Sequence, residues 1–179
     1  MTRSIAILAL LLGSLAAPAL AGDVSLSDDG VVTWHSRLDP IEIEWKAGGV
    51  ISRIVARITA TVAPVDPQGI RDAQALSEAE ARASLADFLH RTKAGPDILA
   101  EIAADIEAAL ATRPAARATT RTDGALGARA LAEISEAFAA GALDGRVVVL
   151  LRGFDQLLDE AWVEVGLTER VMSRARPSG

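Results

Sequence analysis

A histidine and three carboxylates lie close together in the first third of the chain. His35 precedes Asp39, Glu42 and Glu44 in the stretch "HSRLDPIEIEWKAGG". Histidine and carboxylate side chains bind borderline and hard metal ions, and they also serve as general acids and bases. A metal site needs three or four such side chains that converge on one point. The stretch therefore raises the hypothesis of a metal- or ligand-binding site, or of a hydrolase centre, at these four residues.

The same stretch also has the pattern of a half-buried strand. Ile41, Ile43 and Trp45 alternate with Glu42 and Glu44, which places the three apolar side chains on one face and the two carboxylates on the other. The carboxylates are then about 7 Å apart, two strand residues from each other. An antiparallel sheet with one solvated face has this alternation as a rule. We therefore favour a solvated strand face over a catalytic or metal site.

Motifs of established enzyme classes are missing from the sequence. It contains neither a nucleophile elbow, a phosphate-binding glycine loop nor an H-E-x-x-H zinc motif, and it has no cysteine. The second histidine, His90, precedes Arg91 and Lys93 at the expected end of a helix, where cations complement the helix dipole. We therefore predict no catalytic residue and no cofactor, and we assign no metal ligand.

The first 21 residues have the organisation of a signal peptide. Arg3 supplies a positive start, residues 5–12 form an apolar segment too short to span a bilayer, and Ala19-Leu20-Ala21 gives the small-x-small pattern of a cleavage site. The alternative is an uncleaved membrane anchor. Cleavage after Ala21 predicts a periplasmic or secreted bacterial protein that begins at Gly22 and has no membrane span.

The composition narrows the classes of partner. The chain has 18 basic and 24 acidic residues; removal of Arg3 with the signal leaves 17 against 24, a net charge of −7. This charge argues against nucleic-acid binding, which depends on the neutralisation of phosphates. The absence of cysteine excludes disulfides and a lipidated N-terminal cysteine.

Hydrophobic periodicity predicts an α+β fold. The expected strands lie at 31–35, 41–46, 50–63, 145–154 and 162–167, and three helices lie between them. We expect one antiparallel sheet in which the N- and C-terminal strands pair, covered by a long alanine-rich helix from Pro67 to about Arg91 and by two further helices. The apolar stripe predicted for the long helix is Ile70, Ala73, Leu76, Ala79, Ala83, Ala86 and Leu89. The strand at 145–154 is apolar enough to be buried on both faces.

The remaining segments are predicted to be irregular. We expect a single domain at 22–168 with an exposed loop at 112–124, followed by a flexible tail at 169–179. The loop carries Arg113, Arg117 and Arg121, which are candidates for contact with an acidic partner or an anionic lipid. Solvated arginines are the commoner situation in such loops, and we favour it here.

The stretch "ARITATVAPVDPQGIRDAQALSEAEARASLADFLHR" resembles the exported domain of the LPP-twenty type lipoproteins. It is more loosely similar to the SIMPL domain and to the N-terminal domain of flagellar assembly protein T. The resemblance covers about residues 54–167, and this chain departs from it in lacking the lipidated cysteine and in carrying the arginine loop. It implies a helix packed on an antiparallel sheet, and an envelope protein that works by interaction. No site residue is carried over.

The sequence thus favours a non-catalytic exported protein that acts in the cell envelope through an envelope protein partner or as a homo-oligomer. The alternative is a periplasmic ligand- or metal-binding protein, or a hydrolase, that uses His35, Asp39, Glu42 and Glu44.

Overall fold

A computed structural model describes residues 22–175. The predicted signal peptide, residues 1–21, and the last four residues lie outside the described part. The strands are β1 (Gly22–Leu26), β2 (Val32–Ser36), β3 (Ile41–Lys46), β4 (Val50–Thr61), β5 (Val148–Asp155) and β6 (Glu160–Thr168). The helices are α1 (Pro67–Ala94), α2 (Pro96–Thr112), α3 (Pro114–Thr120), α4 (Gly124–Ala139) and α5 (Glu169–Ala175).

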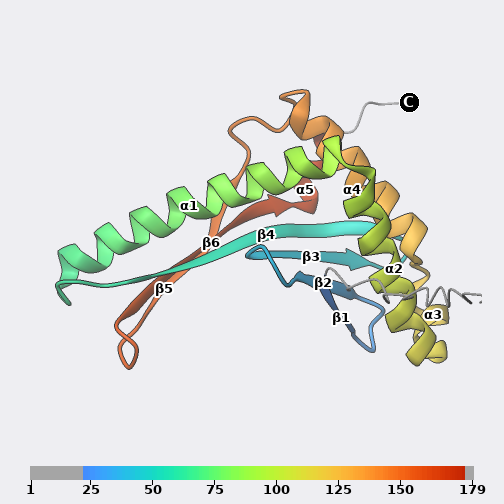
Figure 1. Cartoon of the computed structure of the whole chain (residues 1–179), viewed down its shortest axis with the longest axis horizontal. Helices are drawn as coiled ribbons and strands as arrows, with labels where there is room; N and C mark the ends of the chain where they lie inside the picture. The colour runs from blue at the N-terminus through green and yellow to red at the C-terminus, as the bar shows by residue number, and fades with distance from the viewer. Residues whose placement is uncertain (1–21, 176–179) are drawn as a thin grey trace, which may run out of the picture.

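The six strands form one antiparallel sheet in the order β1-β2-β3-β4-β6-β5 (Figure 1). The N-terminal and C-terminal halves of the chain meet where β4 pairs with β6, from Arg53 opposite Thr168 to Thr61 opposite Glu160. Strand β1, which the sequence analysis does not predict, adds one edge. The predicted α+β fold with an antiparallel sheet and a long covering helix is confirmed.

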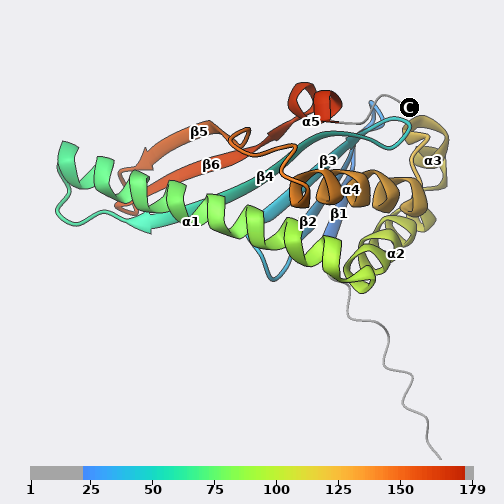
Figure 2. The same ribbon diagram turned by 90° about the horizontal axis from the view of Figure 1, so that it is seen from above.

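One face of the sheet is covered by α1, α2 and α4. Figure 2 shows α1 and α4 lying over the strands. The covered face carries side chains that are fully buried, among them Ile43, Trp45, Ile54, Val163 and Val165. The tryptophans join sheet to helices, since Trp45 Nε1 donates to the Gly127 carbonyl of α4 at 3.2 Å. None of the described helices has the length and apolarity needed to cross a membrane.

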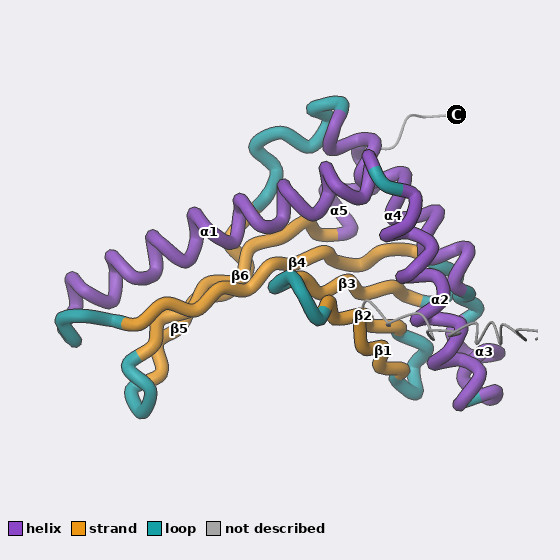
Figure 3. Tube along the Cα trace, viewed as in Figure 1, coloured by secondary structure: helices purple, strands orange, loops and turns teal. Residues whose placement is uncertain are grey.

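The covering helices do not extend over the whole sheet. Pairing of β3 with β4 stops at Ile41 opposite Ala56, whereas β4 continues beside β6 to Thr61. The projecting part, which we call the arm, comprises residues 57–77 and 151–164 and lies at the left of Figures 1 and 3. Its small core of Val62, Ala73 and Ala161 is separate from the main core. The arm is therefore two layers deep, with only α1 above its strands.

Helix α1 begins at a strong cap. The carboxylate of Asp66 accepts hydrogen bonds from the amides of Gln68 and Gly69 at 2.9 and 2.7 Å, and Pro67 occupies the first turn. The buried residues of α1 are Gly69, Ala73, Ser77, Ala81, Leu85, Phe88, Leu89 and Thr92.

The predicted stripe of α1 is wrong for three of its seven members, whereas Ala73 and Leu89 are buried as predicted. Leu76 is 53% exposed, and Ala79 and Ala83 are also exposed. Alanines occur on every side of this helix and distinguish no face, while two of the buried positions, Ser77 and Thr92, are polar. A search for apolar periodicity therefore does not identify the side of α1 that is buried against the sheet.

The predicted exposed loop at 112–124 is partly wrong, because α3 forms inside it. Pro114 starts this short helix; its last residue, Thr120, and Thr122 beyond it are buried. The Thr122 hydroxyl accepts a hydrogen bond from the Gly49 amide at 2.9 Å and lies 3.2 Å from the Lys46 carbonyl oxygen. These contacts fix the end of the segment to the turn between β3 and β4.

The predicted flexible tail is also wrong for residues 169–175, which form α5. Met172 is buried in the main core, and the Lys46 ammonium lies 2.5 Å from the Glu169 carboxylate. The hydrogen bond to Glu169 raises the pKa of Lys46 above its ordinary value. One apolar residue and one ion pair thus hold this segment.

The strand predicted at 145–154 to be buried on both faces is instead an edge strand. It corresponds to β5, which is last in the strand order and has Val148 and Leu151 exposed. An apolar run has the same composition in the centre of a sheet and at its edge, so this prediction is wrong for a reason that composition does not reveal.

We predict that Ser77→Ala stabilises the protein. Ser77 is fully buried, and its hydroxyl has no hydrogen-bond partner among the described residues. Removal of an unsatisfied hydroxyl from a helix interior should raise the free energy of unfolding by about 0.5–1.5 kcal/mol, measured by urea denaturation. Ala81→Ser, one turn further on the same buried stripe, is the matched control and should lower it. A loss of stability in Ser77→Ala would show that the hydroxyl is satisfied.

Candidate functional site

The uncovered face of the sheet carries the histidine and two of the carboxylates singled out in the sequence. Residues directly opposite each other in an antiparallel ladder point to the same face. The opposed pairs on this face are His35 with Glu42, Glu44 with Arg53, and Arg57 with Glu164. Strands β2, β3, β4 and β6 therefore each contribute a charged or titratable side chain to one surface.

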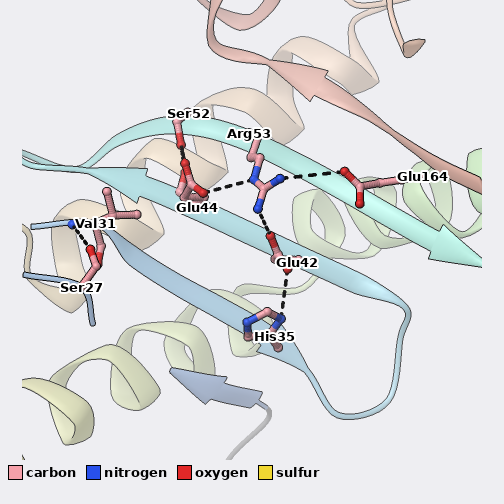
Figure 4. A network of polar contacts seen from close by, with 8 residues as sticks. All are labelled: Ser27, Val31, His35, Glu42, Glu44, Ser52, Arg53 and Glu164. Atoms are coloured by element: carbon pink, nitrogen blue, oxygen red, sulfur yellow. Dashed lines mark hydrogen bonds and ion pairs between the residues drawn. The ribbon is translucent and has the colours of Figure 1, made fainter. Parts of the chain in front are cut away.

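Arg53 is the centre of this surface (Figure 4). Its Nη2 lies 2.6 Å from Glu42 Oε1, its Nε 3.1 Å from Glu44 Oε2, and its Nη1 3.9 Å from Glu164 Oε1. His35 Nδ1 is 3.3 Å from the other oxygen of Glu42, and the Ser52 hydroxyl donates to Glu44 at 2.5 Å. These six residues are called the Arg53 network below. One guanidinium on β4 thus holds three carboxylates from two other strands, β3 and β6.

The network accounts for the alternation seen in the sequence. Ile41, Ile43 and Trp45 are buried on the covered face, as predicted. Glu42 and Glu44 lie on the other face, but their side chains are only 25% and 24% exposed because Arg53 lies against them. Their oxygens therefore accept hydrogen bonds from a fixed cation, which makes the arrangement an ion-pair network between strands.

Asp39 does not join this network. Its carboxylate accepts a hydrogen bond from Arg91 of α1 at 2.8 Å, and this bond, together with Asp87, raises the pKa of Arg91 above its ordinary value. Within residues 22–175, no three His, Cys, Asp or Glu side chains converge as a metal site requires. The structure thus brings together three of the four residues proposed from the sequence and directs Asp39 to the end of α1.

A shallow polar hollow of about 340 Å³ lies beside the network. Its lining includes His35, Asp39, Glu42, Arg57 and Glu164. Glu164 is 8% exposed, its Oε1 has no hydrogen-bond partner in the described structure, and the Arg57 guanidinium stacks on the Trp162 ring at 4.1 Å. The hollow presents both signs of charge, and it is where the alternative hypothesis of ligand binding would have to apply.

The second histidine and the arginines of segment 112–124 are occupied elsewhere. His90 lies near the end of α1, edge-on to Phe138 at 5.4 Å between ring centres. Arg113 donates to the Leu26 carbonyl at 3.1 Å, and Arg117 forms an ion pair with Glu107. Arg113 and Arg117 therefore brace the segment against β1 and α2, and Arg121 caps the end of α3 with a positive φ of 47°.

A different surface combines exposure with apolar character at the tip of the β5–β6 hairpin. Leu157 is 94% exposed and Leu158 is 63% exposed. The carboxylate of Asp155 accepts from the amides of these two leucines at 2.8 and 3.3 Å, and Asp159 adopts a positive φ of 50°. This turn chemistry fixes the hairpin and holds both leucines outward.

The arm as a whole carries most of the exposed large apolar side chains. Nine such side chains are found in the described residues, and five lie on the arm: Val65, Leu76, Leu151, Leu157 and Leu158. Sequence reasoning missed these residues, because it placed Leu76 in the apolar stripe of the long helix and Leu151 in a strand buried on both faces, and made no prediction for the segment that contains Leu157 and Leu158. The available signal was a pair of leucines in a turn whose other residues are polar.

No family model, curated protein or solved structure matches this chain. The candidate surfaces therefore rest on geometry alone, and the resemblance over residues 54–167 stays a prediction.

We predict that Arg53→Gln lowers the free energy of unfolding by about 1–2 kcal/mol at neutral pH. The substitution leaves Glu42, Glu44 and Glu164 without their common cation, and partial exposure keeps the loss below that of a deeply buried pair. Chemical denaturation measures it. Arg71→Gln, whose arginine bonds only to Gln68 in the described structure, is the matched control and should cost less than about 0.5 kcal/mol. An unchanged Arg53→Gln protein would contradict this account.

Proposed function

We propose that this chain is a non-catalytic exported protein of the periplasm that acts by binding another polypeptide through its arm. One observation carries the proposal: the exposed apolar side chains gather on a projecting part of the molecule that ends in an edge strand. Exposed apolar groups that cluster in this way mark interaction surfaces in soluble proteins.

The edge of β5 supplies the second element of such a surface. In the described structure β5 pairs with β6 alone, so its outer backbone amides and carbonyls have no strand beside them. Edge strands are usually guarded by charges or proline. Strand β5 carries one such charge, Arg152, which pairs with Glu78 of α1, but it also exposes Val148 and Leu151. A bulge between Val149 and Leu151 limits the regular edge to residues 151–155. An extended segment of a partner would add beside these residues and pack its side chains on Leu157 and Leu158.

The charged surface around Arg53 supports a binding protein over a hydrolase or a metal-binding protein. Arg53 occupies the oxygens of Glu42 and Glu44 that a substrate or metal would need. The resemblance to LPP-twenty type domains, which implies work by interaction, is part of the same proposal. Hydrolysis or metal binding at His35 has no comparable observation in its favour.

A photocrosslinking amino acid at Leu157 should capture the partner in cells that export the protein. We expect a discrete adduct from position 157 and a loss of at least tenfold when Leu151→Lys is introduced beside it, because a charge disfavours strand addition. Leu38, 90% exposed in the β2–β3 loop and outside the arm, is the matched control position. Equal adducts from both positions, or none from position 157, would contradict the proposal, and the adduct mass distinguishes a second copy from another protein.

Export predicts a defined mature N-terminus. Intact-mass measurement of the periplasmic protein should give a chain that starts at Gly22. Ala19→Arg and Ala21→Arg should each block cleavage, because the protease pocket admits only small side chains at these two positions. Leu20→Ala, between them, should be cleaved normally. Accumulation of the wild-type chain in the cytosol with residues 1–21 attached would contradict export.

A further inference from the structure

The backbone nitrogen of Gly22 lies against a buried carboxylate. It donates a hydrogen bond to Asp105 Oδ2 of α2 at 2.8 Å, across 83 residues of sequence. The same oxygen accepts from Trp34 Nε1 at 2.8 Å. Asp105 is 3% exposed, and Trp34 is 2% exposed. The first residue of β1 is therefore tied to a carboxylate inside the main core.

This carboxylate has fewer partners than its burial requires. Its second oxygen, Oδ1, is buried and has no hydrogen-bond partner in the described structure. Two neutral N–H groups on Oδ2 do not neutralise a charge, and buried charges in proteins are normally paired and fully hydrogen bonded. The Arg37 guanidinium is close enough to Asp105 for an electrostatic interaction, but its ion pair is with Asp23, at 2.5 Å. The carboxylate that holds the Gly22 nitrogen through one oxygen thus has a second, buried oxygen that is unfilled in the described structure.

The space around Gly22 admits no side chain. A Cβ on this residue would lie 2.3 Å from Trp34 Nε1 and 2.5 Å from the His35 carbonyl oxygen, well inside any permitted contact. Glycine is therefore required for the backbone nitrogen to reach Asp105. The same residue is the one that follows the small-x-small sequence Ala19-Leu20-Ala21.

We propose that cleavage after Ala21 completes this site, and that the α-ammonium of Gly22 becomes the buried counter-ion of Asp105. Water hydrolyses the Ala21–Gly22 peptide bond: its oxygen goes to the new Ala21 carboxylate, and the Gly22 nitrogen, with two hydrogens, binds a further proton at neutral pH. A nitrogen that donates one hydrogen as an amide then carries three. One continues to serve Oδ2, and another serves the unfilled Oδ1.

The cleavage step rests on the proposed export, but the ion pair depends only on a free amine at Gly22. Processing then changes the stability of the fold: the uncleaved chain keeps an incompletely paired carboxylate in its core, and the cleaved chain has it paired. The packing of the core and the specificity of the protease therefore both constrain the residues at the cleavage site.

The test compares two purified proteins, produced in the cytosol as fusions to a ubiquitin-like domain whose protease leaves no extra residue. One begins at Gly22, and the other retains Ala21 and so keeps an amide at position 22. We expect the Gly22 protein to melt roughly 4–10 °C higher. Both proteins carrying Asp105→Asn should melt together. Equal melting temperatures with Asp105 present, or a difference that survives Asp105→Asn, would overturn the proposal.

A second readout needs no substitution. The α-amine of the Gly22 protein should react with an amine-specific ester at least tenfold more slowly than that of the Ala21-extended protein, because Gly22 is buried against Asp105. Equal rates would overturn the proposal. Both measurements use protein made without export, so failure of cells to process the chain would count against the proposed function and leave this test unaffected.

Discussion

A six-stranded sheet whose helices all pack on one side has to leave its other face to water, and most features of this chain follow from that constraint. The covered face is apolar and is joined to the helices by two tryptophans: Trp34 bonds to Asp105 of α2, and Trp45 bonds to the Gly127 carbonyl of α4. Gly127 lets α4 pack closely on α2, since a Cβ there would lie 2.9 Å from Ile106 Cδ1, which would have to shift. On the open face the strands present charges instead. These charges must be paired across strands, and Arg53 provides this pairing through its contacts with Glu42, Glu44 and Glu164.

The dimensions of the helices explain the arm. Helix α1 has 28 residues and is therefore about 42 Å long, whereas α2 and α4, with 17 and 16 residues, reach about 25 Å. Only α1 extends over the far part of the sheet. A helix about 10 Å wide covers two strands that are about 4.8 Å apart. Helix α1 lies over β4 and β6, so β5 is left at the side with its apolar residues exposed. The candidate binding edge thus exists because the arm has three strands and its single helix covers only two of them.

Local patterns predicted the parts of the fold that local interactions decide. The alternation of β3 predicted the correct inward residues, and the start of α1 at Pro67 was predicted as well. The stripe of α1 was not, because alanine is equally at home on either side of a helix. The position of β5 at an edge depends on which strands its neighbours pair with. The contacts of Arg53 with Glu164, and of Asp105 with Gly22, join residues far apart in the sequence, and no spacing rule indicates them.

The two edges of the sheet lie against different helices, which would separate the proposed cleavage at Gly22 from the proposed binding at β5. Strand β1 is held at one edge by the bond between Gly22 and Asp105 of α2, while β5 at the other edge is joined to α1 by a hydrogen bond from Gln74 to the Gly153 carbonyl and by the Arg152–Glu78 ion pair. A change at Gly22 therefore alters the stability of the core under α2 without reshaping the arm. A chain that crosses a membrane unfolded benefits when its native state gains full stability only afterwards, since a less stable precursor unfolds more often. An amine released at Gly22 would increase the stability of the native state at the moment of cleavage. The position of this one glycine would therefore set the order of export, cleavage and binding.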